Sequence, residues 1–127
     1  MTQRDEGVIK FRAEWTPSDP IPDSDIADLN AWRERMADLK LIGEYAEGIG
    51  YGNVSQRIPG TTSFWVSGSA TGQIPRLDGR HYCVVTEARP RDNVVVCRGS
   101  IVASSESMSH AVIYASCPEV QAILHGH

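Results

Sequence analysis

The tail of the chain carries the residue types best able to do chemistry. Ser104, Ser105 and Glu106 stand together, and His125 and His127 follow at the end of a short apolar run. Side chains at positions i and i+2 of a strand face the same way, so these two imidazoles can share one divalent cation, most naturally zinc. Histidines at a chain end also occur without a ligand role, and the pair alone leaves both interpretations open.

A catalytic zinc ion usually takes three protein ligands and leaves one position open. The tail supplies two, and the remaining histidines of the chain, His81 and His110, are not obvious third ligands. His81 opens a predicted strand, whereas His110 lies within a predicted helix. We therefore expect the third ligand to come from another chain or from a segment after residue 127 of a longer parent protein.

Ser104 and Ser105 fall where a helix is predicted to begin. Free N–H groups and the positive end of the helix dipole favour an anion at that place. The same positive end favours an ionised Glu106, which beside a metal could act as a base. The common alternative is that the serines only cap the helix and the glutamate only complements its dipole. On this segment alone that alternative is the stronger one.

Two glycine-rich segments add candidate ligands for a substrate. Asn53 follows Gly52 within residues 48–57, and its amide can both donate and accept hydrogen bonds. Residues 67–72 follow a predicted strand and offer hydroxyl groups and free N–H groups that could cradle an oxyanion. The candidates there are Ser67, Gly68, Ser69, Thr71 and Gly72. Each segment alone is better explained by a plain turn, and the first matches neither the dinucleotide fingerprint nor the P-loop.

Regular elements are predicted around these segments. Apolar residues recur at helical spacing from Ile26 to Leu39, with Trp32 among them. This apolar stripe should pack on a sheet and leave Arg33 towards water. The predicted strands are residues 63–67, 82–86, 94–97 and 120–124.

The helix that follows the serines ends at Pro118 and has two distinct faces. One face, predicted to be buried, is an apolar stripe of Met108, Ala111, Val112 and Ala115. The other face, predicted to point elsewhere, carries a carboxylate, an imidazole and a phenol on Glu106, His110 and Tyr114.

The N-terminal end differs from the rest. Residues 8–15 alternate between apolar and polar side chains, which predicts a strand or an extended arm, and a loop rich in proline follows. This segment could lie in its own sheet or across a neighbouring subunit. We expect residues 1–23 to form the arm and residues 24–127 to form the main domain, which is part of a longer chain.

The composition is that of an ordinary globular domain. The 127 residues are 41% hydrophobic and 22% charged, and the formal net charge is −4. The chain has no basic stripe to bind nucleic acid and no apolar run long enough to cross a membrane, and its N-terminus lacks an apolar signal core. We expect a cytoplasmic protein whose 3 cysteines stay reduced.

Four elements in this order resemble the class II aldolase/adducin family. They are Gly52–Arg57, the loop Ser67–Gly72, Ser104-Ser105-Glu106 with His110 and Tyr114, and His125-Gly126-His127. The resemblance runs from about residue 26 to the end of the chain. It implies a three-layer α/β/α fold around a mostly antiparallel sheet, assembled as a homo-tetramer with active sites between subunits.

The resemblance also implies roles for the candidate residues. Asn53, loop 67–72 and the serine pair would hold the substrate, Glu106 would be the catalytic acid/base, and the tail histidines would bind Zn²⁺ or another divalent cation. The implied activity is that of an aldolase-type carbonyl-lyase, which acts through an enediolate on a small sugar-like hydroxy-ketone with or without phosphate. The alternatives are a non-catalytic adducin-like relative and an epimerase, dehydratase or decarboxylase of the same fold acting on a non-phosphorylated acid.

Overall fold

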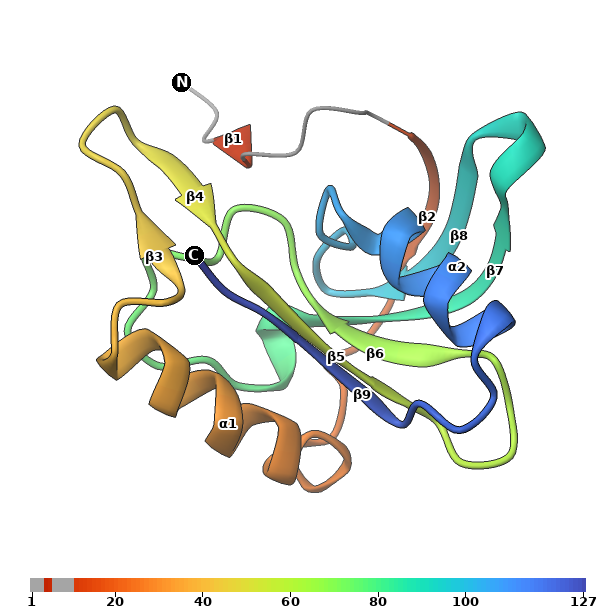
Figure 1. Ribbon diagram of the computed structural model, residues 1–127, viewed down its shortest axis with the longest axis horizontal. Coiled ribbons are helices and arrows are strands. Elements are labelled where there is room, and N and C mark those ends of the chain that lie inside the picture. Colours follow the sequence, from red (N-terminus) through yellow and green to blue (C-terminus); the bar gives the residue numbers. More distant parts are fainter. Residues whose placement is uncertain (1–3, 6–10) are drawn as a thin grey trace.

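The computed structural model describes residues 4–5 and 11–127, and its main feature is a six-stranded sheet (Figure 1). The strand order is β2-β8-β7-β6-β5-β9. Neighbouring strands run antiparallel except β2 and β8, which run parallel. The strands are β2 (Arg12–Pro17), β5 (Asn53–Arg57), β6 (Phe64–Ser67), β7 (Tyr82–Arg89), β8 (Val94–Gly99) and β9 (Ala122–His125).

Helices and a small second sheet complete the described fold. The helices are α1 (Ala27–Asp38) and α2 (Ser107–Ser116), with short 3-10 helices η1 (Asp23–Asp25), η2 (Gly79–His81) and η3 (Pro90–Asp92). The small sheet has the order β1-β4-β3 and is made of β1 (Arg4–Asp5), β3 (Gly43–Glu44) and β4 (Ile49–Tyr51). Within the described residues, neither α1 nor any other helix is long and apolar enough to span a bilayer.

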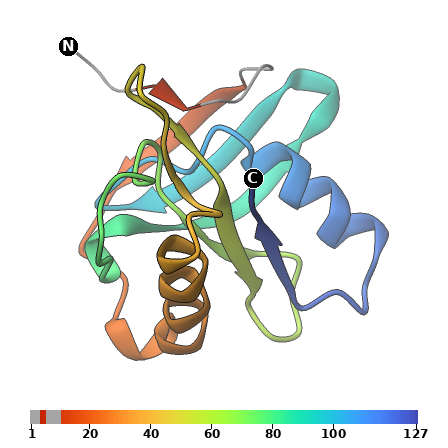
Figure 2. The ribbon, with the colours of Figure 1, turned by 60° about the vertical axis from the view of Figure 1, so that its left-hand side comes forward.

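The two long helices pack on opposite faces of the six-stranded sheet (Figure 2). Successive side chains of a strand point to opposite faces. On β7, Val84 joins the core under α1, whereas Cys83 and Val85 join the core under α2. The mixed α/β class with a mostly antiparallel sheet is therefore confirmed, while the complete three-layer arrangement stays a prediction.

The predicted strands are present in the structure. Those between residues 63 and 124 correspond to β6, β7, β8 and β9. Of the strand predicted at residues 8–15, β2 contains residues 12–15 and lies in the chain's own sheet beside β8. Residues 8–10 lie outside the described residues.

Helix α1 departs from the prediction in which of its side chains are buried. Trp32 and Leu39, which belong to the expected apolar stripe, are 54% and 68% exposed, whereas Arg33 is 1% exposed. The prediction that Arg33 faces water is wrong. Its guanidinium donates to three backbone oxygens within residues 71–75. Buried carbonyl groups need hydrogen-bond donors, and the guanidinium of Arg33 carries several donors in one plane. The side chain is therefore buried in spite of its charge.

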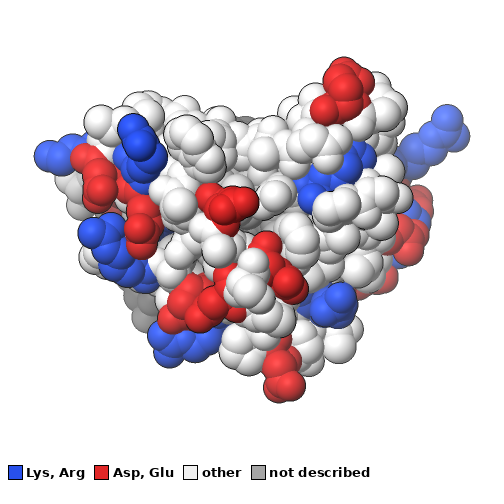
Figure 3. All heavy atoms as spheres, turned by 90° about the horizontal axis from the view of Figure 1, so that it is seen from below, with Lys and Arg blue, Asp and Glu red and all other residues white. Residues whose placement is uncertain are grey.

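Charged side chains of both signs are interspersed on the face shown in Figure 3. Among the exposed ion pairs of the described residues, Arg76 lies 3.8 Å from Glu34 and 3.7 Å from Asp38. Exposed pairs of this kind contribute at most about 1 kcal/mol each. On the face in Figure 3, the described residues form no continuous basic stripe.

Arg57 joins the end of β5 to the end of α2. It is 6% exposed. Its guanidinium nitrogens donate, at 2.8–3.0 Å, to the backbone oxygens of Thr61, Tyr114, Cys117 and Val120. The last carbonyl groups of a helix have no partner within the helix. Arg57 donates to one of these groups, on Tyr114, and to the carbonyl of Cys117 directly after the helix, and it thereby fixes the end of α2 against the sheet.

Replacement of Arg57 by lysine should lower the free energy of unfolding by about 2–4 kcal/mol, because one ammonium group cannot serve all these carbonyl oxygens. Urea denaturation followed by circular dichroism measures the change. Arg12→Lys is the matched control, since the Arg12 side chain is 68% exposed and pairs with Glu14. That substitution should cost less than about 0.5 kcal/mol. Equal losses in the two variants would contradict the structural role of Arg57.

Candidate functional site

The start of α2 and the end of β9 bring an acid beside an imidazole. Glu106 precedes the first residue of α2, and its Oε2 lies 3.3 Å from Nδ1 of His125. The centroids of the His125 and His127 rings are 5.0 Å apart. The side chains of Glu106 and His125 are 28% and 34% exposed, so both are accessible to a ligand.

A small polar pocket opens beside this acid. It is lined by Gly50, Tyr51, Gly52, Asn53, Ser104, Ser105 and Glu106. The structure thus brings Asn53, the serine pair and Glu106 together. Because β5 and β9 pair with Asn53 opposite His125, the pocket adjoins the strand that ends in the two histidines.

Gly52 allows β5 to begin this close to its neighbours. Its φ angle is 83°, in a region that side chains with a Cβ atom rarely adopt. A Cβ atom there would lie 2.6 Å from Cγ1 of Ile42 and 3.1 Å from the backbone oxygen of His125. The glycine before Asn53 is therefore required by space and by backbone conformation.

The hydroxyl groups of Ser67 and Thr71 are used inside the fold. Oγ of Ser67 accepts from the backbone N–H of Val54 at 3.1 Å, and Oγ1 of Thr71 donates to the backbone oxygen of Gly68 at 2.9 Å. Ser67 and Thr71 are 3% and 5% exposed. The backbone oxygen of Ser67 also accepts from the N–H of Ser104 at 3.2 Å. These contacts hold the serine segment against β6.

Ser69 and Gly72 complete this loop. The N–H of Ser69 donates to the backbone oxygen of Val102 at 2.9 Å. Gly72 lies so close to the backbone of Gly43 that a Cβ atom would clash with it. None of the five loop candidates is among the described residues that line the polar pocket. They instead support the neighbouring segments that line it.

Ser104 stabilises the turn that precedes α2. Its Oγ accepts from the backbone N–H of Glu106 at 3.4 Å, and its backbone oxygen accepts from the N–H of Ser107 at 3.0 Å. Ser104 is 4% exposed. The N-cap residue of α2 is Glu106 and it has no side-chain cap, so the Ser104 hydroxyl stabilises the turn that leads into the helix. Ser104 also lines the pocket.

Helix α2 turns a polar face into the fold. Its buried residues are Ser107, His110 and Tyr114, whereas Val112 of the predicted buried stripe is 43% exposed. The prediction that the imidazole and the phenol point away from the packed side is wrong. The reason is that β5 offers hydrogen-bonding side chains beneath them, so burial leaves these polar groups paired.

His110 makes two hydrogen bonds to side chains of β5. Its Nε2 lies 2.6 Å from Oδ1 of Asn53, and its Nδ1 lies 2.5 Å from Oγ of Ser55. Burial, and to a lesser degree the neighbouring His125, lowers the pKa of His110 to about 4. The ring is therefore neutral at neutral pH. Sequence reasoning did not include His110 or Ser55 among the site residues, although His110 shares a helix face with Tyr114.

Two tyrosines of the β3–β4 hairpin stand against the last histidine. The Tyr45 hydroxyl lies 3.0 Å from Nδ1 of His127, and the Tyr51 ring centroid lies 5.5 Å from that of His127. A hydrogen bond at one ring nitrogen fixes the orientation of a histidine that binds a metal through the other. Sequence reasoning missed both tyrosines, because nothing in their spacing relates them to the tail.

His125 and His127 supply part of the ligand set that a divalent cation needs. Within the described residues, no group of three or more His, Cys, Asp and Glu side chains is arranged to hold a metal ion. His125 and His127 nevertheless place two imidazoles side by side. Within the described residues, Nδ1 of His125 is buried without a hydrogen-bond partner, and Oε2 of Glu106 lies 3.3 Å from it. A buried nitrogen in this position suits a metal ligand.

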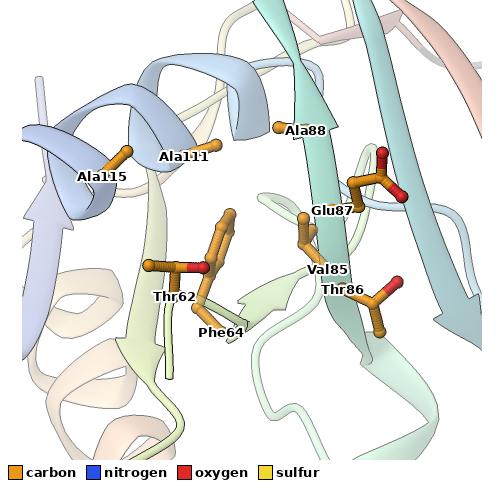
Figure 4. Close-up of a pocket in the computed structure, with 8 residues that line it drawn as sticks. All are labelled: Thr62, Phe64, Val85, Thr86, Glu87, Ala88, Ala111 and Ala115. Atoms are coloured by element: carbon orange, nitrogen blue, oxygen red, sulfur yellow. The ribbon is translucent and has the colours of Figure 1, made fainter. Parts of the chain in front are cut away.

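A second pocket lies between α2, β6 and β7 (Figure 4). It is lined by Thr62, Phe64, Val85, Thr86, Glu87, Ala88, Ala111 and Ala115. Glu87 is the ionisable group among these residues, and the Phe64 ring projects towards α2. This pocket contains none of the candidate residues.

Comparison with known proteins gives one finding. A family model described as the Class II Aldolase and Adducin N-terminal domain matches residues 41–127. No curated protein matches the chain. The matched segment begins after α1 and contains all the candidate site residues.

The pKa of His110 predicts a loss of stability in acid. Unfolded His110 takes up a proton as the pH falls through its ordinary value of 6.5, whereas the folded ring stays neutral down to about 4. The unfolded state therefore binds more protons in this window, and the folded state loses up to about 3 kcal/mol as the pH falls through it. Urea denaturation at a series of pH values measures the slope.

His110→Gln removes the titrating ring and should flatten this slope between about pH 6.5 and 4. His81→Gln is the matched control and should keep it, because His81 lies in η2, outside the polar pocket. A slope that is unchanged in His110→Gln would show that other groups cause the acid sensitivity.

Proposed function

The chain belongs to the class II aldolase and adducin family, and on that basis we propose that it carries the acid/base and ligand-binding groups of a metal-dependent carbonyl-lyase. The observation that supports this most is the position of Glu106. Its carboxylate lies 3.3 Å from His125 and lines the same pocket as Asn53 and the serine pair. Cleavage next to a carbonyl group needs a proton-transfer group and stabilisation of an oxyanion in one place.

Glu106 is the proposed acid/base. It directly precedes α2, so its carboxylate lies near the positive end of the helix dipole. In the proposed reaction, Glu106 moves the proton on the carbon next to the carbonyl of a hydroxy-ketone. The partial exposure of its side chain, 28%, leaves room for the substrate to reach it.

Asn53 and the start of α2 are the proposed binding groups for substrate oxygens. The lining of the pocket is mainly polar, which suits the oxygen atoms of a sugar-like molecule. The N–H groups at the start of a helix suit a phosphate or a carboxylate equally. We therefore propose a hydroxy-ketone substrate with either a phosphate or a free oxygen-rich end.

His125 and His127 would hold the metal ion, Zn²⁺ or another divalent cation. When bound, such an ion supplies a positive charge that stabilises negative charge developing on the substrate's carbonyl oxygen. Tyr45 would keep the His127 ring in the orientation for ligation, through its contact with Nδ1. We propose that a further ligand comes from another segment or chain, in a homo-tetramer whose subunits have the three-layer architecture.

Zinc should raise the melting temperature of the untagged protein, because a ligand that binds the folded state alone stabilises it. His125→Ala should remove this response, since it deletes one of the two imidazoles. His81→Ala is the matched control and should retain the response even if its own melting temperature is lower. Calorimetric titration with zinc gives the affinities directly. A zinc response of equal size in His125→Ala would contradict the proposed site.

Glu106→Gln should lower turnover by about 10²- to 10⁴-fold, because the amide cannot take up the proton. Zinc affinity should change little, since the amide keeps the size of the carboxylate. The assay is retro-aldol cleavage by the full-length zinc-loaded enzyme, with hydroxy-ketones that carry or lack a phosphate. The turnover of Glu106→Asp should lie between that of Glu106→Gln and that of the unmodified enzyme. Full activity in Glu106→Gln would exclude this residue as the acid/base, and no activity in the unmodified enzyme would favour a non-catalytic relative.

A further inference from the structure

A continuous series of hydrogen bonds is buried between α2 and β5. The hydroxyl of Tyr114 lies 2.8 Å from Oγ of Ser55, which lies 2.5 Å from Nδ1 of His110. Nε2 of His110 lies 2.6 Å from Oδ1 of Asn53. The four residues are 0–4% exposed. Because they are out of contact with bulk water, each polar hydrogen in the series needs a partner within the protein.

Such a series can run in two directions. Hydroxyl groups, a neutral imidazole and a side-chain amide can all donate and accept. In the first direction, Tyr114 donates to Ser55, Ser55 donates to Nδ1 of His110, and Nε2–H of His110 donates to the oxygen of Asn53. In the second direction, the NH₂ group of Asn53 donates to Nε2, Nδ1–H donates to Ser55, and Ser55 donates to Tyr114.

The hydrogen of the Tyr114 hydroxyl decides between the two directions. Within the described part of the chain, the Tyr114 hydroxyl has Ser55 as its hydrogen-bond partner and no other. The second direction makes this hydroxyl an acceptor and leaves its hydrogen buried without a partner, at a cost of about 1–3 kcal/mol. In the first direction, the hydrogens of Tyr114, Ser55 and His110 are all donated to an acceptor within the series. This direction is therefore the favoured one.

We propose that His110 is a positioning residue that fixes the direction of the Asn53 amide. The neutral ring donates from Nε2 to the oxygen of Asn53, so the NH₂ group of Asn53 is the end that remains for the polar pocket. Phe64 stacks against the His110 ring, with centroids 6.4 Å apart, and limits its rotation. The pocket thereby offers a donor to a substrate oxygen. This last step rests on the proposed function, whereas the direction of the series does not.

The experiment is to determine the tautomer of His110 by nuclear magnetic resonance of the ¹⁵N-labelled protein, with His110→Gln used to assign its ring signals. At neutral pH we expect a protonated Nε2 and an unprotonated Nδ1. A protonated Nδ1, or a ring protonated at both nitrogens, would overturn the proposal. So would a scalar coupling between Nε2 of His110 and Nδ2 of Asn53, which exists only when the amide donates.

Asn53→Asp provides the reference. A carboxylate can only accept, so in this variant Nε2 of His110 must carry the hydrogen whichever direction the unmodified protein uses. At pH 8 the pattern of His110 ring signals should therefore be the same in Asn53→Asp and in the unmodified protein. A change of tautomer between the two would show that the Asn53 amide was the donor.

A rescue experiment separates positioning from packing. Glutamine at position 110 keeps an N–H group that can donate to Asn53, whereas His110→Leu fills the space without one. The Nδ2 signals of Asn53 should stay near their original positions in His110→Gln and move in His110→Leu. Equal displacement in both variants would indicate a packing role and overturn the proposal. Lack of zinc binding or turnover would refute the proposed function alone, because these signals are read without ligand.

Discussion

The pairing of β5 with β9 is the constraint on which the site depends. This antiparallel register sets Asn53 opposite His125, and it is possible only because Gly52 leaves room for the backbone oxygen of His125. Helix α2 precedes β9 in the chain and packs on one face of the sheet, and a short loop joins the end of the helix to the start of the strand. The start of the helix, with Glu106, then comes to lie beside the end of the strand. One strand register thus brings together the amide of Asn53, the carboxylate of Glu106 and the imidazoles of the tail.

Helix α2 has two tasks that a purely apolar helix could not combine. The segment at its start must present Ser104 and Glu106 to the pocket, and His110 in its body must bond to Asn53. The second task requires polar side chains inside the fold, and these cost free energy unless each is paired. Ser55 meets this requirement by bonding to both His110 and Tyr114. Arg57 then secures the far end of the helix through its last carbonyl groups.

The sequence predicted the regular elements better than the orientation of single side chains. Strand alternation and the motif order depend on local spacing, so β6 to β9 and the meeting of Glu106 with the tail could be expected. The burial of Arg33 could not, because its partners are carbonyl groups some forty positions further along the chain. The same holds for Ser67 and Thr71, whose hydroxyls appeared available for a ligand and are bonded within the fold. Periodicity identifies faces of a helix, but the partner surface decides which face is buried.

A neutral imidazole suits the position beside Asn53 and the proposed ligand histidines for a physical reason. A protonated His110 would place a positive charge beside His125 and oppose any cation there. Burial prevents this, because it disfavours the charged ring and lowers the pKa of His110 to about 4. Glutamine or asparagine would also be neutral, but each rotates about more bonds and can exchange its donor and acceptor ends. An imidazole is rigid, and with Ser55 donating to Nδ1 its other nitrogen can only donate. Burial keeps the ring of His110 neutral, and the neutral ring in turn fixes which end of the Asn53 amide faces it.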